Sequence, residues 1–149
     1  MLDLIEVTLS LDTAIYADGD VLAATQEVTG VWRANYNTGL LRSIVLNDKD
    51  DQGIALDLVF LRSNVALGTE NNAPNISDTN ASEVLGIVNI ATGDYVDLGG
   101  ARVATKLLAA PLCLESTTTS LWMAAITRGG TPTYSAAGII VKLGIERAR

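Results

Sequence analysis

The chain has 149 residues, of which 48% are hydrophobic and 18% charged, a balance that suits one folded domain with a sizeable core and excludes a disordered chain. Its net charge is −7 and its ten basic residues are scattered, which argues against nucleic acid as a partner. The chain contains no histidine, so it lacks the commonest general base and metal ligand; we therefore expect neither an enzyme nor a cofactor.

Apolar and polar residues alternate with a period of two along most of the chain, the pattern of half-buried strands. In the first such stretch, Ile5, Val7 and Leu9 share one face. The stretch at 40–47 is partly apolar on both faces, as in a covered sheet. Strands are predicted at residues 4–11, 27–34, 40–47, 54–63, 83–90, 94–99, 106–116, 119–128 and 138–146.

Three features interrupt this pattern. Residues 16–20 read as a turn, with glycine after aspartate. Pro111 lies inside a predicted strand, and this indicates a sheet edge or a bulge because proline cannot donate to a ladder. A polar loop occupies 68–86, where Asp78 can cap a short helix.

Short strands with regularly spaced turns predict an all-β fold: a single antiparallel β-sandwich, jelly-roll-like, over residues 1–149, with at most one short helix near 78–84. An extended N-terminal tail and a short C-terminal tail are expected to flank it. The start resembles no signal peptide, and no apolar run approaches the ~20 residues of a membrane helix. The lone Cys113 cannot form an internal disulfide, so we expect synthesis in a reducing cytoplasm and no membrane partner.

The acidic stretch after residue 47 looks most like a chemical site. A calcium loop of the EF-hand type beginning at Asp48 would place Asp50 and Gly53 acceptably. Its twelfth position, however, requires glutamate and holds Val59, inside an apolar strand. We therefore predict no metal site, with weak surface calcium binding at Asp48 and Asp50 as the alternative. A solvated hairpin tip, or a contact for a basic partner, is favoured.

Other residues permit functional readings beside structural ones. Asp94 and Asp97 could serve as a glycosidase pair, although paired carboxylates are common on β-proteins and we predict no catalytic residue. Aromatic residues could line a sugar-binding face, yet in alternating strands they more often lie in a core or subunit interface. These aromatics are Trp32, Tyr36, Tyr95, Trp122 and Tyr134.

The phrases at 48–63, 77–88 and 120–144, with similarity spanning nearly the whole chain, resemble a family of small virion structural proteins of tailed bacteriophages and prophages. The resemblance implies a β-sandwich decoration or cement protein on the capsid surface, made in the host bacterial cytoplasm. It also implies the major capsid protein as partner and a symmetric homo-oligomer, most simply a trimer. It supplies no catalytic motif. The alternatives are a glycan-binding module of a phage tail or fibre and, third, a carboxylate-dependent glycan hydrolase.

The two ends of the chain are natural tethers for such a role. The first five residues are apolar and extended, and the last residues are basic, suited to an acidic capsid patch or simply a frayed tail. The predicted contacts with the capsid or with other subunits are Leu2, Leu4, Ile5, Trp32, Arg147 and Arg149.

Overall fold

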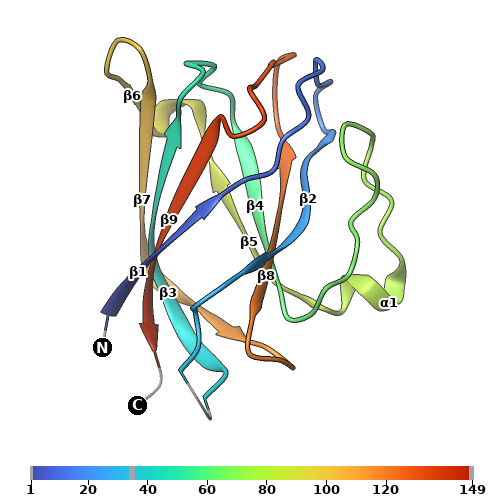
Figure 1. Cartoon of the computed structure of the whole chain (residues 1–149), viewed down its shortest axis with the longest axis vertical. Helices are drawn as coiled ribbons and strands as arrows, with labels where there is room; N and C mark the ends of the chain where they lie inside the picture. Colours follow the sequence, from blue (N-terminus) through green and yellow to red (C-terminus); the bar gives the residue numbers. More distant parts are fainter. Residues whose placement is uncertain (1, 34–35, 148–149) are drawn as a thin grey trace.

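The computed structural model describes residues 2–33 and 36–147, and Figure 1 shows them as two packed β-sheets. The strands are β1 (Leu2–Thr8), β2 (Val21–Val28), β3 (Thr38–Asp48), β4 (Leu56–Leu61), β5 (Val84–Ile90), β6 (Tyr95–Asp97), β7 (Arg102–Glu115), β8 (Leu121–Thr127) and β9 (Ile139–Arg147). A short helix α1 (Asp78–Ala81) and a 3-10 turn η1 (Thr92–Asp94) complete the elements. No helix among the described residues is long and apolar enough to span a membrane.

The strand order is that of a jelly roll. One sheet has the order β1-β9-β3-β7-β6 and the other β2-β8-β4-β5, and every pairing is antiparallel. Without the short β6, which extends the β7 edge, each sheet has four strands, and the chain passes repeatedly from one to the other. The predicted all-β, single-domain sandwich of jelly-roll type is therefore confirmed, as is the single short helix near residue 78. The helix cap is Ser77, one residue before the predicted Asp78.

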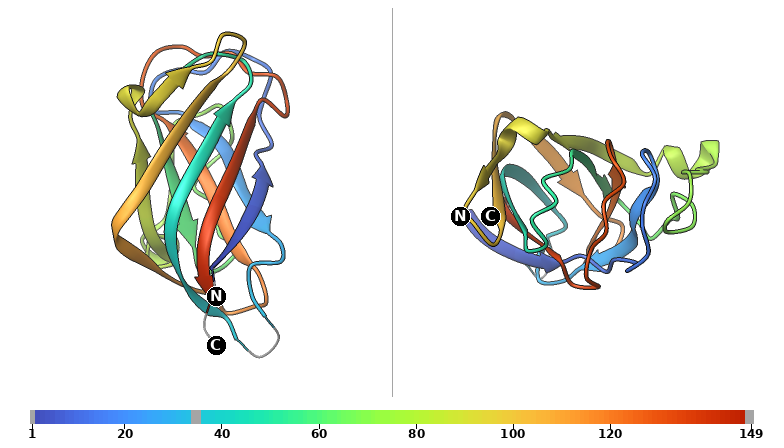
Figure 2. Two further views of the ribbon diagram at one scale, coloured as in Figure 1. Left: turned by 90° about the vertical axis from the view of Figure 1, so that its left-hand side faces the viewer. Right: turned by 90° about the horizontal axis from the view of Figure 1, so that it is seen from above.

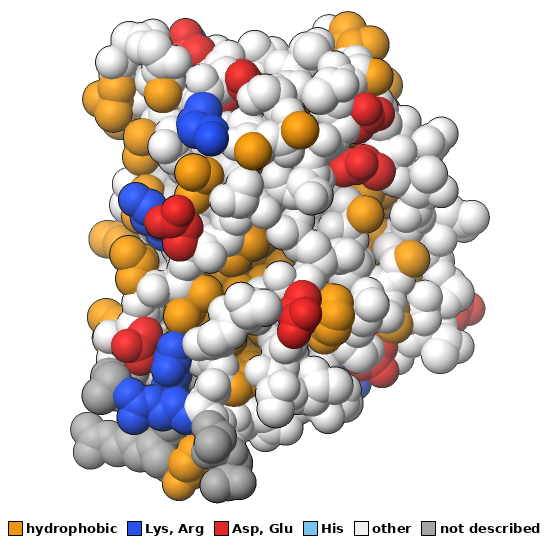
Figure 3. All heavy atoms as spheres, viewed as in Figure 1, with side chains coloured by type: hydrophobic (Ala, Val, Ile, Leu, Met, Phe, Trp, Pro, Cys, Tyr) orange, Lys and Arg blue, Asp and Glu red, His pale blue; other side chains and the backbone are white. Residues whose placement is uncertain are grey.

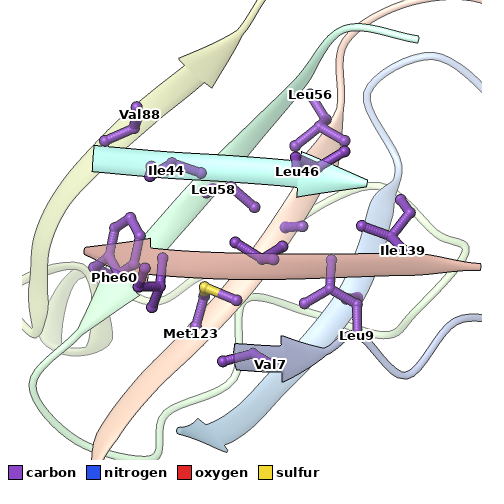
Figure 4. Close-up of a cluster of buried hydrophobic side chains, with 14 of the residues drawn as sticks. Val7, Leu9, Ile44, Leu46, Leu56, Leu58, Phe60, Val88, Met123 and Ile139 are labelled. Atoms are coloured by element: carbon purple, nitrogen blue, oxygen red, sulfur yellow. The ribbon is translucent and has the colours of Figure 1, made fainter. Parts of the chain in front are cut away.

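The core fills the space between the two sheets, as Figure 4 shows for residues from both. Leu56, Leu58 and Phe60 alternate inward from β4, and none of the three has exposed surface. Val7 and Leu9 point into the same core from the N-terminal end of the chain. Each fully buried side chain of this kind contributes about 1.5–3 kcal/mol through loss of contact with water.

The second predicted strand, 27–34, is wrong. The strand ends at Val28, and the chain then turns through Gly30, whose φ of +72° suits glycine. β2 pairs with β8 through two register shifts, one on each side of Ala23. These irregularities destroy the period of two in β2, so its sequence did not read as a strand. Residue 34 of the predicted strand lies outside the described residues.

A bulge explains why β3 seemed apolar on both faces. Leu41, Ile44 and Leu46 are all buried, so the inward phase changes between Leu41 and Ile44. On the partner strand, Leu41 pairs with Leu112 and Ser43 with Leu107, so residues 108–111 form a multi-residue bulge opposite Arg42. Pro111 lies in that bulge, beyond the end of β6, which confirms the predicted irregularity. The expected covered sheet at 40–47 is wrong, because the other face of β3 is uncovered (Figure 2, left).

The outer face of the four-stranded sheet, by contrast, is covered by the chain itself. Residues 62–83, which include α1, fold back over it (Figure 1, right-hand side), and we call them the covering segment. Backbone hydrogen bonds join the segment to β2 at Val21. A second apolar cluster is buried beneath it: Val21, Val59, Leu61, Leu67, Ala124 and Ile126. β4 is therefore apolar on both of its faces because both are buried.

Candidate interaction surfaces

The outer face of the five-stranded sheet is a regular surface that no other described segment covers. No loop crosses it in Figure 2 (left), and hydrophobic side chains follow the corresponding left-hand margin in Figure 3. Five large apolar side chains on this face or directly beside it are more than 60% exposed: Leu2, Leu4, Val96, Leu98 and Leu107. Exposed apolar groups gathered on one face of a soluble protein mark a candidate interaction surface.

Strand pairing places these apolar groups at the two margins of the face. In one row across the sheet, Leu4 of β1 pairs with Gly144, which pairs with Ser43, which pairs with Leu107 of β7. The floor between the two leucines is therefore made of small residues. A Cβ added to Gly144 would come 2.2 Å from the Ser43 Oγ, so the residues at the centre of this row are closely packed. Being small, they also project less from the sheet than the two leucines.

The charges on this face are balanced. In the next row, Glu6 of β1 lies opposite Lys142 of β9. Nearer the termini, Arg42 Nε donates to Glu146 Oε2 at 2.7 Å. Two acids and two bases thus lie on this face, Glu6 on the edge strand β1 and the other three on β9 and β3, whereas the whole chain carries a net charge of −7.

The predicted contact residues at the N-terminus divide between the two sides of β1. Leu2 and Leu4 are each 64% exposed, whereas Ile5 points inward and packs against the core. The expected extended N-terminal tail is instead an edge strand, since residues 2–8 pair in full with β9. Because β1 is an edge strand, its pairing with β9 on one side holds these residues in the sheet. Trp32 is partly buried and packs against the core close to Gly39, so it is not an open platform.

Arg147 is not a frayed tail. Its Nη2 donates to the backbone carbonyl of Gly30 at 2.7 Å, and its Nε lies 3.4 Å from an Oδ2 of Asp3. Its side chain is only 16% exposed, so it braces the end of the sandwich rather than projecting toward a partner. Arg149, the other predicted basic contact, lies outside the described residues.

Asp48 is a structural residue and not part of a solvated hairpin tip. Its side chain is 1% exposed, and its two oxygens accept hydrogen bonds from the backbone N–H groups of Asp50 at 3.1 Å and Gly53 at 2.6 Å. The loop joins β3 to β4, which belong to different sheets, so it is not a hairpin. Because the carboxylate is already committed to backbone donors, it is poorly placed for the weak calcium site considered above.

The neighbouring acids brace the same end of the molecule. Asp50 accepts hydrogen bonds from the Ser135 backbone N–H at 2.8 Å and from its hydroxyl, which joins the β3–β4 loop to the β8–β9 loop. Asp51 forms an ion pair with Arg102 at 2.6 Å. No cluster of three or more metal-ligating side chains occurs in the described part of the chain. A basic partner is therefore not needed to explain these acids.

Gly138 allows that bracing, which leads to a prediction. An alanine Cβ there would lie 1.9 Å from the Asp50 Oδ2, so Gly138→Ala should displace the carboxylate and cost about 2 kcal/mol through the lost hydrogen bonds. In an Asp50→Ala background, the same change should cost at least about 1 kcal/mol less. Urea denaturation of the four proteins measures this coupling. Gly129→Ala, with nothing near its Cβ, is the matched control, and strictly additive losses would contradict the account.

The tyrosines near the Asp48 end hold loops together. The Tyr95 hydroxyl donates to the Ile54 carbonyl at 3.0 Å, and that of Tyr16 donates to the Leu22 carbonyl at 2.9 Å. Burial raises the pKa of Tyr16 to about 12, and burial with the nearby Asp48 charge also raises the pKa of Tyr134. These phenols therefore remain neutral at ordinary pH and are better suited to packing than to proton transfer.

Asp94 and Asp97, the pair considered for glycoside hydrolysis, are both engaged in local turns. Asp94 accepts from the Ala91 backbone N–H at 2.8 Å and pairs with Lys106, and these contacts lower its pKa. Asp97 accepts from the Gly99 backbone N–H at 2.8 Å. A glycosidase needs one acid with a raised pKa, so the environment of Asp94 argues against that role.

Two hollows lie toward the end of the molecule that holds the termini. The larger, about 580 Å³, is mostly apolar and includes Leu40, Leu85 and Cys113. The smaller, about 340 Å³, is lined by Arg33, Tyr36, Asn37 and Thr117 to Thr119. Tyr36 is 47% exposed, whereas the other aromatics proposed for sugar binding are at least partly buried.

Sequence reasoning missed the β6–β7 side of the uncovered face. Leu107 is the most exposed large apolar residue of this face, at 77%. It belongs to an unbroken apolar run, so alternation could not show which residues of the run point outward. Val96 and Leu98 lie in and after a strand of only three residues. The even spacing of Val96 and Leu98 was the available signal, and it becomes informative only once β6 is known to lie at a sheet edge.

Comparison with known proteins does not assign the chain to a family. No protein-family description and no curated protein matches the chain. Two solved structures, of the Gx and Gt strains of infectious bursal disease virus, align with 99% and 100% of it at 13% identity, with TM-scores of 0.22 and 0.23. The chain spans 37% and 38% of the length of those chains. Similarity this low carries no argument, so the jelly-roll assignment follows from the strand order of the chain itself.

Proposed function

We propose that this chain is a structural protein of a bacteriophage virion that binds the outer surface of the capsid as a symmetric oligomer and stabilises the shell. The observation that carries the proposal is the uncovered, apolar and charge-balanced face of the five-stranded sheet. The resemblance of the sequence to phage virion proteins supplies the major capsid protein as the partner. The protein then acts by contact and performs no chemistry.

The internal use of polar groups supports this role. Asp48, Asp50 and Asp51 join loops, and Asp94 and Asp97 hold turns. These bonds stiffen one end of the sandwich. A stiff subunit that contacts several capsid proteins at once transmits load between them, and simultaneous contacts multiply modest affinities.

Binding to the assembled shell would stabilise it by mass action, because the separated capsid subunits lack the complete site. When the free protein is present at one hundred times its dissociation constant, each occupied site gains about 2.7 kcal/mol. The shell then resists dissociation more strongly without a change in the capsid protein itself. No energy source or cofactor is required.

Shells lacking the protein provide the test. Purified protein added to empty, undecorated shells of the parent phage should pellet with them on centrifugation, and calorimetry should show a higher melting temperature of the shell. Pelleting should saturate at a fixed ratio of protein to capsid subunit. Protein that stays in the supernatant at every concentration, and leaves the shell melting temperature unchanged, would contradict the proposal.

One observation favours the alternative, a glycan-binding module of a tail or fibre. Tyr36 is exposed beside the polar hollow that includes Asn37 and Thr118, and an aromatic ring next to hydrogen-bonding side chains suits a sugar ring. Binding to cell-surface glycans that is lost in Tyr36→Ala, with no binding to shells, would establish this alternative.

A further inference from the structure

We propose that two copies of this chain join edge to edge, β1 against β1 in antiparallel order, so that their five-stranded sheets form one continuous sheet. The contact is centred on Leu4, which lies opposite Leu4 of the other copy. Two identical strands paired in this way are related by a two-fold axis. The pair gives the proposed symmetric oligomer a defined contact without depending on capsid binding, and it contains two copies where the sequence resemblance implies three.

The free edge of β1 offers backbone hydrogen-bonding groups to a further strand. β1 is the last strand of its sheet, beside β9, with which residues 2–8 pair without a register shift (Figure 2, left). The Leu9 N–H donates to the Ile139 carbonyl at 3.0 Å, so odd-numbered residues of this stretch direct their backbone groups toward β9. The even-numbered residues, Leu4 among them, therefore direct theirs to the free edge.

The other sheet edges carry features that hinder the addition of a strand, and β1 does not. β6 has only three residues, and the free side of β7 beyond it contains the bulge at 108–111 with Pro111. β2 has register shifts on both sides of Ala23, and the covering segment bonds to it. β5 lies beside β7, whose Leu112 is 2.5 Å from a Cβ placed on Gly86. β1, by contrast, has seven residues, no bulge, no proline and no lysine.

The acids of β1 are matched by bases within each copy. Charged side chains on an edge strand ordinarily discourage pairing. The Asp3 Oδ2, however, lies 3.4 Å from the Arg147 Nε, and Glu6 lies opposite Lys142 in the register of β1 and β9. This edge is therefore locally balanced in charge, although the whole chain carries −7, so a second copy meets little repulsion here.

The order of side chains makes the strand complementary to itself. In antiparallel pairing centred on Leu4, Leu2 lies opposite Glu6 of the other copy. Asp3 then lies opposite Ile5, so no acid faces an acid. Parallel pairing in register would instead place each acid beside its own copy, which is unfavourable. Leu4, 64% exposed in the single chain, packs against Leu4 of the other copy across the two-fold axis.

Gln26 of β2 fixes where the free edge ends. Its Nε2 donates to the Thr8 carbonyl at 2.9 Å, and its Oε1 accepts from the Ser10 N–H at 3.1 Å. The edge is thus occupied from Thr8 onward, and an added strand can pair only with Leu4 and the outward-directed residue on each side of it. Three opposed pairs that each exchange two bonds give about six backbone hydrogen bonds. The centre of this short edge is Leu4, which sets the register of the contact.

Two charge variants at the centre of the contact provide the test. Because residue 4 lies opposite its own copy, Leu4→Lys and Leu4→Glu should each bring like charges together and weaken association by about thirtyfold or more. An equimolar mixture of the two should recover association as a mixed dimer that holds one copy of each. A strand-edge contact is smaller than a standard interface, so sedimentation equilibrium at roughly 10–100 μM protein is the measurement.

A third variant and a matched control separate this contact from general effects. Leu4→Pro removes the outward N–H but leaves the bonds to β9, so it should also give monomers. The same two charge changes at Ile87, which is 55% exposed on β5 of the other sheet, should leave the dimer intact. Tryptophan fluorescence and thermal melting show whether each variant is folded.

An unaltered protein that is a monomer or a trimer throughout this range contradicts the pairing, as does undiminished association in any of the folded Leu4 variants. Dissociation by the Ile87 changes, or a mixture of charge variants that stays monomeric, contradicts it as well. Shell binding is scored separately by centrifugation. A dimer that depends on Leu4 but ignores shells keeps the pairing and contradicts the proposed function; a monomer that pellets with shells does the reverse.

Discussion

Asp48→Ala is expected to lower the free energy of unfolding by about 3 kcal/mol. The carboxylate is 1% exposed and accepts backbone hydrogen bonds from Asp50 and Gly53, so its removal leaves two N–H groups without their acceptor. Hydrogen bonds to a charged group contribute about 1.5–3 kcal/mol each, and partial access of water offsets some of the loss. Urea denaturation followed by tryptophan fluorescence gives the difference.

Asp18→Ala is the control for that experiment. Asp18 is exposed in the turn before β2, and its loss should change stability by no more than about 0.5 kcal/mol. Added calcium should not stabilise the unaltered protein, because the Asp48 carboxylate is occupied by the backbone. A loss below about 1 kcal/mol for Asp48→Ala, or a clear calcium-dependent rise in melting temperature, would contradict the structural role of Asp48 and favour calcium binding by this loop.

Phe60→Ala should have a larger effect, about 4 kcal/mol. Phe60 is the only phenylalanine in the chain, is completely buried and lies opposite Met123 in the register of β4 and β8. Its truncation removes a large apolar surface and leaves a cavity that surrounding strands cannot fully close. Many domains of this size have a total stability of only 5–15 kcal/mol, so the variant should melt well below the unaltered protein.

Thermal and urea unfolding measure this loss, and Phe60→Leu separates its two causes. Leucine keeps the site apolar and most of its volume, so it should cost less than about 1.5 kcal/mol if cavity formation dominates the alanine result. Ile87→Ala, on the exposed side of β5, should cost much less than either. Equal losses for Phe60→Ala and Ile87→Ala would contradict the assignment of the core.

The fold was predictable where alternation was undisturbed and was not where the backbone is irregular. β9 places its large apolar residues as the period of two requires, and it lies in a regular ladder with β1 and over most of its length with β3. β2 was missed because register shifts around Ala23 break its period. Val31 and Trp32 were included in the predicted strand 27–34 because they are apolar, although the chain turns just before them at Gly30, whose φ is +72°.

The interaction surface was only half predictable, for a related reason. Leu2 and Leu4 follow directly from alternation in β1, whose inward residues were unambiguous. Leu107 could not be placed because residues 108–111 loop out opposite Arg42, and no local pattern shows on which side of the bulge the phase changes. The role of Arg147 depends on Asp3 and Gly30, which are distant in sequence and become neighbours only through the sheet.

The position of β9 between β1 and β3 has a consequence for folding kinetics. Leu2 pairs with Glu146, so the first strand has no sheet partner until the most distant strand has docked. Closing so long a loop is slow, and sandwiches dominated by such contacts fold in roughly milliseconds to seconds. Until β9 arrives, the apolar β1 remains unpaired and open to wrong partners, so dilution should improve the yield of refolding more than it would for a protein of local contacts.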